Sequence, residues 1–205
     1  LALHLLRGTP YIYMGEEIGM MDPHYTSMRD YVDVEALNAY DALIKKGIDE
    51  KEAFEIVQSK ARDNSRVPMH WDNSQYAGFS GHKPWLMPTD QDKINVEKEL
   101  QDGEIFNFYQ KLIKLRKSEK LISEGHIKPF LMEHPQVMAY ERYLDDSNEK
   151  LLVFANFYGK ETEVKIPAEY LNKEGHILIQ NYDKNLASLP SVLQLKPYEA
   201  LAIKL

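Results

Sequence analysis

The stretch that organises this chain is Ser59-Lys60-Ala61-Arg62-Asp63-Asn64-Ser65-Arg66-Val67-Pro68-Met69-His70-Trp71. Proline does not fit inside a helix, and the residue before a proline favours extended backbone. We therefore expect a helix to end near Ala61 and an ordered polar loop to follow it. Arg62 and Arg66 each carry a rigid set of five donors, which suits carboxylates and paired hydroxyl groups. These arginines either bind a ligand or only hold the loop against neighbouring carboxylates, and this stretch alone leaves both roles open.

The composition excludes several classes of protein. The chain has 205 residues, with 25 Lys and Arg against 32 Asp and Glu, and a formal net charge of −7. Such acidity argues against nucleic-acid and anionic-membrane partners, which require clustered basic charge. Cysteine is absent, which excludes disulfides, zinc–thiolate sites and cysteine nucleophiles. The histidines are scattered, so we expect no metal and no cofactor.

The chain begins Leu1-Ala2-Leu3-His4-Leu5-Leu6, without an initiator methionine. We expect a fragment of a longer polypeptide, which opens with the tail of an apolar helix that ends at Gly8. Residues 9–15 are aromatic and β-branched residues between turn formers, a pattern that predicts a buried strand. Glu16 and Glu17 follow it. Adjacent carboxylates point in different directions and match a catalytic pair poorly, so we predict a structural role for both.

Two helices are predicted before the arginine-rich stretch. The first runs from Val34 to Lys46 and ends at Gly47, with an apolar stripe of Leu37, Tyr40 and Ile44. The second opens with a capping box, Asp49 and Glu52, and continues to about Lys60. Its inner residues are expected to be Ala53, Ile56, Val57 and the stem of Lys60.

The rest of the first 120 residues holds a long loop and one more helix. Residues 67–92 are rich in Pro, Gly, Asn and Ser, and a loop of this length is commonly functional. Its aromatic residues either stack on a ligand or hold the loop in place. The last clear helix is predicted from Glu104 to Ser118, and its basic end suits the negative pole of the helix dipole.

After residue 120 the hydrophobic period changes from 3.6 to 2, which predicts an antiparallel sandwich or barrel. The expected strands are His126 to Met132, Val137 to Tyr143, Lys150 to Phe157, Glu161 to Ile166, His176 to Gln180, Val192 to Leu195 and Ala200 to Leu205. No catalytic constellation occurs in this half, so we interpret it as a structural domain.

Five motifs follow one another along the chain. They are Gly8-Thr9-Pro10-Tyr11-Ile12-Tyr13-Met14-Gly15-Glu16-Glu17-Ile18-Gly19-Met20, Asp33-Val34-Glu35-Ala36-Leu37-Asn38, Arg62 to Trp71, Ala77-Gly78-Phe79 with Lys83-Pro84-Trp85, and Ile94-Asn95-Val96-Glu97. In this order they resemble the α-amylase superfamily of glycoside hydrolases, in the branch of oligo-1,6-glucosidase, dextran glucosidase and trehalose-6-phosphate hydrolase. The chain departs from the family pattern at Met14 and His70, where glutamine is commoner, and at Val67, where threonine is usual.

The resemblance implies an α+β fragment: the terminal part of a (β/α)8 barrel, then an antiparallel β-sandwich. Residues 1–120 would hold the last barrel strand (Tyr11 to Met14), the inserted helices and the last helix (Glu104 to Ser118), and residues 121–205 the sandwich. A barrel strand without its neighbours has two unpaired edges, so we expect residues 1–15 to be rearranged, disordered or paired with another copy. Active sites of such barrels lie at the C-terminal ends of the strands.

The resemblance also implies retaining hydrolysis of an α-glucosidic bond by two carboxyl groups roughly 5–5.5 Å apart. In the family these groups follow earlier strands, so none of residues 1–205 is expected to be catalytic. Arg62 matches the family arginine that contacts the glucose at the cleavage site, and Glu35 matches a glutamate lining the neighbouring subsite. Arg66 is expected to be structural.

The substrate that we expect for the parent enzyme is trehalose 6-phosphate, because Asp22-Pro23-His24-Tyr25-Thr26 resembles the Asn-Pro-His-Phe-Thr of phosphotrehalases. The alternatives are an α-1,6-glucosidase acting on isomalto-oligosaccharides or dextran, and a non-catalytic amylase-like interaction or carbohydrate-binding module. The expected partner is thus a small oligosaccharide or sugar phosphate, and the expected location is the cytoplasm.

Overall fold

The computed structural model describes all residues from 1 to 205, and they form two compact units. One unit comprises Leu1–Tyr11 and Phe108–Leu205, and the other comprises Ile12–Asn107. The division into a barrel part and a sandwich at residue 120 is a prediction about the parent protein and stays one. No helix in the structure is both long and apolar enough to cross a bilayer.

The unit that contains the C-terminus is built on an antiparallel sheet, as predicted. Its strands are β1 (His126–Phe130), β2 (Val137–Tyr143), β3 (Lys150–Asn156), β4 (Thr162–Lys165), β5 (His176–Gln180), β6 (Val192–Leu195) and β7 (Ala200–Lys204). Five strands form one sheet in the order β1-β2-β3-β7-β5, and β4 pairs with β6 in a second sheet. All the pairs are antiparallel, and the register shifts once, between Ile177 and Ile179.

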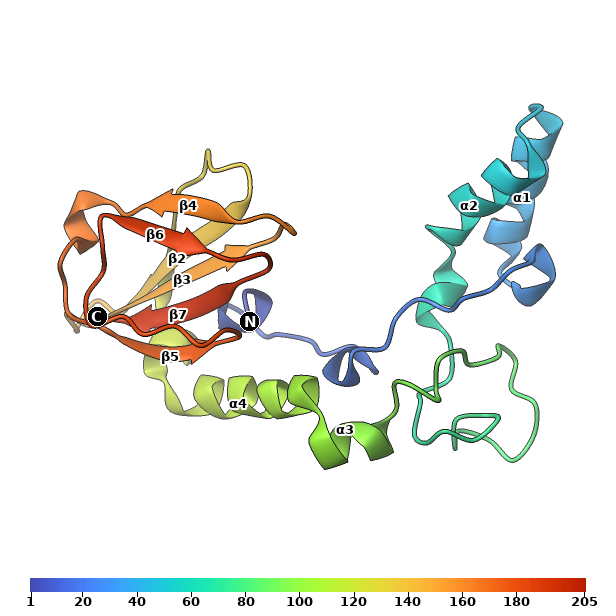
Figure 1. Ribbon diagram of the computed structural model, residues 1–205, viewed down its shortest axis with the longest axis horizontal. Helices are drawn as coiled ribbons and strands as arrows, with labels where there is room; N and C mark the ends of the chain where they lie inside the picture. The colour runs from blue at the N-terminus through green and yellow to red at the C-terminus, as the bar shows by residue number, and fades with distance from the viewer. The chain divides into compact units, whose positions relative to one another are not determined.

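The five-stranded sheet is covered on both faces. Leu152 and Phe154 of β3 belong to a buried cluster completed by β4 and β6, whereas Leu151 and Val153 belong to a second cluster. The residues that helical segments contribute to the second cluster are Leu5, Leu112, Leu121 and Ile122. Successive side chains of a strand point to opposite faces, so the interior of β3, residues 151–155, is apolar at every position. Figure 1 shows β3 between β2 and β7 in the sheet.

The helices of the structure are α1 (Val34–Lys45), α2 (Glu50–Gln58), α3 (Val96–Asp102), α4 (Glu104–Ser118) and α5 (Lys120–Ser123). Short 3₁₀ turns occupy Leu3–Leu5, Glu16–Ile18, Met28–Asp30, Arg62–Ser65 and Ala168–Tyr170. Gly47 follows α1 at a φ of 84°, a left-handed conformation that glycine adopts without strain. The end of α1 at this glycine and the bounds of α4 are confirmed.

The inner faces of α1 and α2 differ in part from the prediction. The two helices pack together over a cluster that includes Ala36 and Val57, with Tyr40 and Leu43 against it. The predicted inward Leu37 and Ile56 are 38% and 40% exposed. Tyr40 on α1 and Ala53 and Val57 on α2 point inward as predicted. The prediction is wrong for Leu37 and Ile56, and it missed Ala36, because small residues carry little hydrophobic signal.

The predicted last barrel strand is absent. Residues 11–14 belong to no sheet, and Tyr11 is 85% exposed. A strand requires a hydrogen-bonded neighbour, and no other segment of this chain supplies one. The missing pairing does not test whether residues 1–15 are rearranged, and that expectation stays a prediction.

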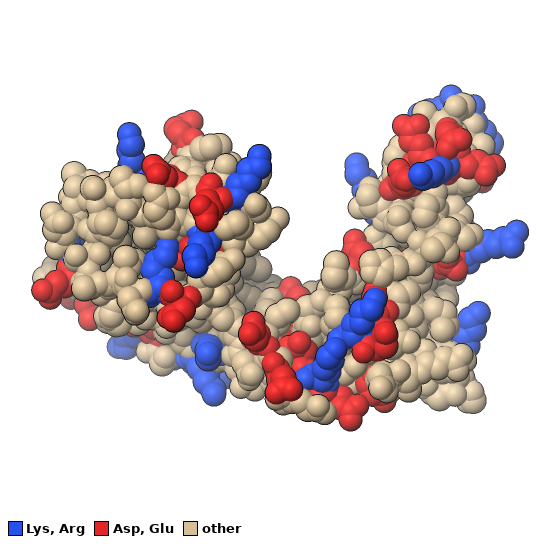
Figure 2. Space-filling view, in the orientation of Figure 1, with Lys and Arg blue, Asp and Glu red and all other residues tan.

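Residues 67–92 contain no helix or strand, as predicted, but their backbone is ordered by specific contacts. Trp71 N–H donates to Ala77 O at 2.8 Å, and Tyr25 Oη donates to Met87 O at 2.9 Å. On the face of the molecule drawn in Figure 2, acidic and basic side chains are interspersed, and no large patch of basic residues appears.

Candidate functional site

Within the arginine-rich stretch, Arg62–Ser65 forms a 3₁₀ turn, which a buried carboxylate connects to another segment. Asp63 is fully buried, and its Oδ2 accepts the backbone N–H groups of Val32 and Asp33 at 2.8 Å each. Three residues separate this turn from the end of α2 at Gln58, close to the predicted helix end. Asp63 thus ties the turn to the segment that leads into α1.

Arg62 contacts two carboxylates at the start of α1. Its Nε and Nη2 donate to Asp33 Oδ2 and Oδ1 at 3.2 and 2.8 Å. Glu35 Oε2 lies 3.0 Å from the same Nη2. The structure therefore brings together Arg62 and Glu35, the two residues that the sequence predicts for a binding site. It also shows the loop-holding contact that was the alternative role for Arg62.

These contacts leave some of the N–H donors of the Arg62 guanidinium without a partner in the protein. Nη1 donates no hydrogen bond within the protein, and the side chain is 56% exposed. A guanidinium has five N–H donors, so an edge of Arg62 remains open to a ligand while the other edge is bound.

Arg66 has the structural position that the sequence predicts. Its Nη1 lies 3.4 Å from Asp63 Oδ1 and 3.7 Å from Asp33 Oδ1. Two arginines therefore surround the buried Asp33 carboxylate. The hydrogen bond from Arg62, together with the charge of Arg66, lowers the pKa of Asp33 below its usual value. The same hydrogen bond to Asp33 raises the pKa of Arg62, so the pair is ionised throughout the neutral range.

Asp33 is the residue that sequence reasoning missed. It lies in the Asp33-Val34-Glu35 motif at the start of a helix, where an aspartate usually caps the first turn. In the structure its side chain makes no cap hydrogen bond. The partner that it does bind, Arg62, is 29 residues away in the sequence, and spacing alone gives no signal for such a contact.

A cavity of about 220 Å³ adjoins these residues. Its charged lining residues are Asp33, Glu35, Lys60 and Arg62, and its apolar ones are Ala36, Ala39, Leu43, Ile56, Val57 and Ala61. A mostly apolar hollow with a few convergent polar groups is the usual form of a small-molecule site. No group of three or more His, Asp or Glu residues is arranged to hold a metal ion.

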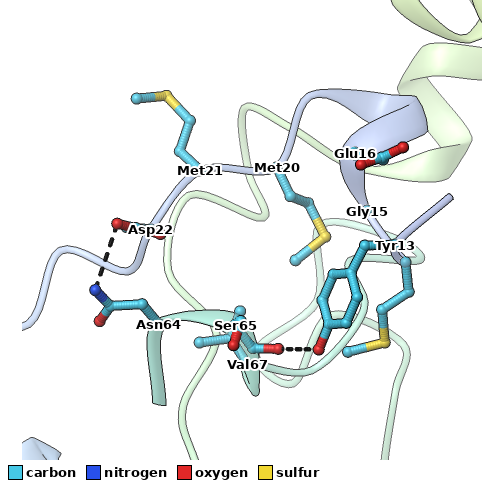
Figure 3. A pocket seen from close by; sticks show the side chains of 10 residues that line it. Tyr13, Gly15, Glu16, Met20, Met21, Asp22, Asn64, Ser65 and Val67 are labelled. Carbon is cyan, nitrogen blue, oxygen red and sulfur yellow. Dashed lines mark hydrogen bonds between the residues drawn. The ribbon is translucent and has the colours of Figure 1, made fainter. Parts of the chain in front are cut away.

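A second cavity, of about 160 Å³, lies between residues 13–22 and the Arg62–Ser65 turn. Figure 3 shows its wall, in which Tyr13 Oη donates to Ser65 O and Asn64 Nδ2 donates to Asp22 Oδ2 at 3.3 Å. The acceptors Glu16 Oε1 and Asn64 Oδ1 are buried without a partner. These contacts hold the segment that follows Tyr13 against the arginine-rich turn.

Two further residues, Glu17 and His70, make contacts that hold the backbone of neighbouring segments. Glu17 Oε2 accepts the backbone N–H of Gly15 at 2.8 Å, in keeping with the structural role predicted for the adjacent glutamates. His70 is buried, its Nδ1 lies 3.0 Å from Ile94 O, and burial lowers its pKa. His70 therefore supports the loop and does not face the Arg62 cavity.

Two family sequence models match the chain. The family described as "Alpha amylase, catalytic domain" matches residues 1–125, and the "Alpha-amylase SusG C-terminal domain" matches residues 137–201. The first match covers more than half of the chain.

Individual relatives agree with these matches. The chain is 39% identical to the trehalose-6-phosphate hydrolase of Bacillus subtilis (strain 168), covering 100% of this chain and 36% of that protein. It is 39% identical to the oligo-1,6-glucosidase of Parageobacillus thermoglucosidasius, covering 99% of this chain and 36% of that protein. The crystal structure of Bacillus licheniformis trehalose-6-phosphate hydrolase superposes with a TM-score of 0.91 at 40% identity, covering 99% of this chain and 37% of that one. The chain thus spans little more than a third of the length of these relatives, and it belongs to the α-amylase family.

Proposed function

We propose that residues 1–205 supply one side of the glucose-binding site of a retaining α-glucosidase, and that Arg62 and Glu35 are the residues that contact the sugar. The observation that carries this proposal is the half-exposed Arg62 side chain, which lines a cavity together with Glu35 and whose Nη1 donates no hydrogen bond within the protein. A guanidinium edge binds two oxygen atoms at once, which orients a sugar ring as well as holding it. Family membership supports the same assignment.

The bond-breaking groups are proposed to lie outside these residues. Retaining hydrolysis needs a nucleophilic carboxylate and a carboxylic acid roughly 5–5.5 Å apart. The carboxylates beside Arg62 are engaged by it, and Asp63 is bound to backbone amides. We therefore expect residues 1–205 alone to release no detectable glucose from p-nitrophenyl α-glucoside, and turnover by this chain would overturn the proposal.

For the full-length protein that contains this chain, the proposed substrate is trehalose 6-phosphate. The support is the Asp22-Pro23-His24-Tyr25-Thr26 stretch, in which the exposed His24 Nε2 lies 2.8 Å from Asp90 Oδ2. Identity to relatives does not separate the candidates, since a trehalose-6-phosphate hydrolase and an oligo-1,6-glucosidase both stand at 39%. An α-1,6-glucosidase therefore remains the second candidate.

The test is a comparison of kcat/KM on trehalose 6-phosphate and on isomaltose, with the full-length protein. We expect a preference for trehalose 6-phosphate of about a hundredfold or more, because a site built for a charged group discriminates strongly against analogues that lack it. Hydrolysis of isomaltose alone would contradict the substrate. A cytoplasmic location belongs to the same proposal, since a charged sugar phosphate does not cross a bilayer unaided.

A further inference from the structure

Asp33 and Glu35 contact the same guanidinium in different ways. Asp33 accepts two hydrogen bonds, from Nε and Nη2 of Arg62, and its side chain is 7% exposed. Glu35 makes one ion pair at 3.0 Å, without a hydrogen bond, and its side chain is 74% exposed. A two-point contact fixes the plane of a guanidinium, whereas a single exposed ion pair does not.

The Asp33 carboxylate is itself held in place through its backbone. Asp63, the residue after Arg62, accepts the N–H of Asp33 at 2.8 Å. The contacts therefore form a closed ring: the side chain of Arg62 binds the side chain of Asp33, and the next residue along the chain binds the backbone of Asp33. Neither segment can move without breaking hydrogen bonds to buried groups.

Helix capping does not account for Asp33. The residue occupies the N-cap of α1, but its carboxylate accepts no cap hydrogen bond from the first turn of that helix. Its oxygens are directed instead to Arg62, and Arg66 lies 3.7 Å from Oδ1. The strongest interactions of the Asp33 carboxylate are thus with Arg62 and not with the helix end.

We propose that Asp33 is a positioning residue, which holds Arg62 by two hydrogen bonds so that Nη1 is presented to a sugar hydroxyl. This inference rests on the proposed function of Arg62. A long, flexible arginine loses conformational freedom when it binds a ligand, and a side chain already fixed loses less. Glu35, by contrast, is free to exchange its ion pair for the ligand.

The first test needs no sugar. Asp33→Asn and Glu35→Gln are matched neutral substitutions at the same guanidinium, and ¹⁵N relaxation of the Arg62 Nε–H in the 205-residue chain reports its order. We expect an order parameter of about 0.8 in the native chain and below about 0.6 in Asp33→Asn. Glu35→Gln should remain near the native value. The backbone N–H signals of Val32 and Asp33 serve as the folding control, because Asp63 binds them in both variants.

A native-like order parameter in Asp33→Asn would overturn the positioning role, and so would equal loss of order in both variants. The second test titrates these chains and Arg62→Met with methyl α-glucoside and follows the backbone N–H signals of Ala36 and Ala61, which line the cavity and are present in every variant. We expect Asp33→Asn to weaken binding roughly tenfold, and Arg62→Met to abolish it. Unchanged sugar binding by Arg62→Met, or no binding by the native chain, would contradict the proposed function, and the relaxation result then decides the positioning role by itself.

Discussion

At the scale of single residues, a side chain outside the candidate site makes an extensive set of hydrogen bonds to the backbone. Arg142 on β2 is fully buried, and no carboxylate lies within ion-pair distance of it. Its guanidinium donates instead to four backbone carbonyls, those of Leu5 in the first 3₁₀ turn, Ile122 in α5, Gly125 after α5 and His126 at the start of β1. Burial lowers the pKa of Arg142, but carbonyl dipoles compensate the charge.

Replacing Arg142 by methionine should therefore strongly destabilise the unit that contains the sheets. Each buried carbonyl left without a donor costs about 1–3 kcal/mol, so we expect a loss of about 3 kcal/mol or more in the free energy of unfolding, measured by urea denaturation followed by circular dichroism. Lys128→Met is the control. Lys128 makes a surface pair with Glu169 at 3.2 Å, and its loss should cost less than about 1 kcal/mol. Equal effects of the two substitutions would contradict this account.

At the scale of elements, α3 depends on one amide side chain. Asn95 is buried, its Oδ1 accepts the N–H of Lys98 at 2.8 Å, and its Nδ2 donates to Gln91 O at 2.7 Å. One residue thus caps α3 and holds the end of the long loop. The sequence contains the Ile94-Asn95-Val96-Glu97 motif but does not predict α3, because a helix of seven residues has too weak a hydrophobic period.

We predict that Asn95→Ala lowers the free energy of unfolding of residues 12–107 by about 1–2 kcal/mol, the usual cost of losing an N-cap. Asn95→Asp should recover part of this loss, since a carboxylate still caps the helix but donates nothing to Gln91. The matched control is Asn73→Ala, at an exposed position, which should change stability by less than about 0.5 kcal/mol. Hydrogen exchange of the α3 amides measures the effect directly.

The strands are predictable because the pattern of apolar residues within each strand shows, without any other segment, which of its positions are buried. Along β3 and β7 the apolar run and the short polar turns set the bounds without reference to any partner. The segment Tyr11 to Met14 has the same kind of composition, yet it forms no strand. The composition of a segment indicates whether it can join a sheet. The strand forms only when a neighbouring segment offers free backbone N–H and C=O groups.

The candidate site is predictable only in part, for a related reason. Arg62 and Glu35 are found through the resemblance to a family, which carries information about three-dimensional positions. Asp33 has no such assignment, and its sequence context favours a helix cap. Only the fold brings its carboxylate to an arginine 29 residues away.

At the scale of the whole molecule, packing and sequence family divide the chain at different places. The match to the amylase catalytic domain extends to residue 125, and so includes α4. Leu112 of α4 nevertheless belongs to the same buried cluster as Leu151 and Val153 of β3, with Phe108 and Leu115 packed against it. The last helix therefore contributes to the core of the C-terminal sheet.

Each of the three hydrophobic clusters lies within one unit: two in the unit of the sheets and one in residues 12–107. Separate cores predict separate unfolding, because cooperativity is transmitted by shared buried contacts. We expect urea to remove hydrogen-exchange protection from α1 and α2 at a lower concentration than from β2, β3 and β7. The helical pair rests on a smaller core, whereas the sheet is covered on both faces.

Two matched substitutions test this independence. Leu86 and Leu152 are both buried, one in the cluster of residues 12–107 and one in the sheet, and Leu→Ala in a core costs about 2–5 kcal/mol. Leu86→Ala should lower the urea midpoint of peptides from α1 and α2 and leave those from β3 unchanged, and Leu152→Ala should do the reverse. A single midpoint that both substitutions shift together, in every peptide, would mean that the two units fold as one, because only a shared core transmits the loss of one leucine to the other cluster.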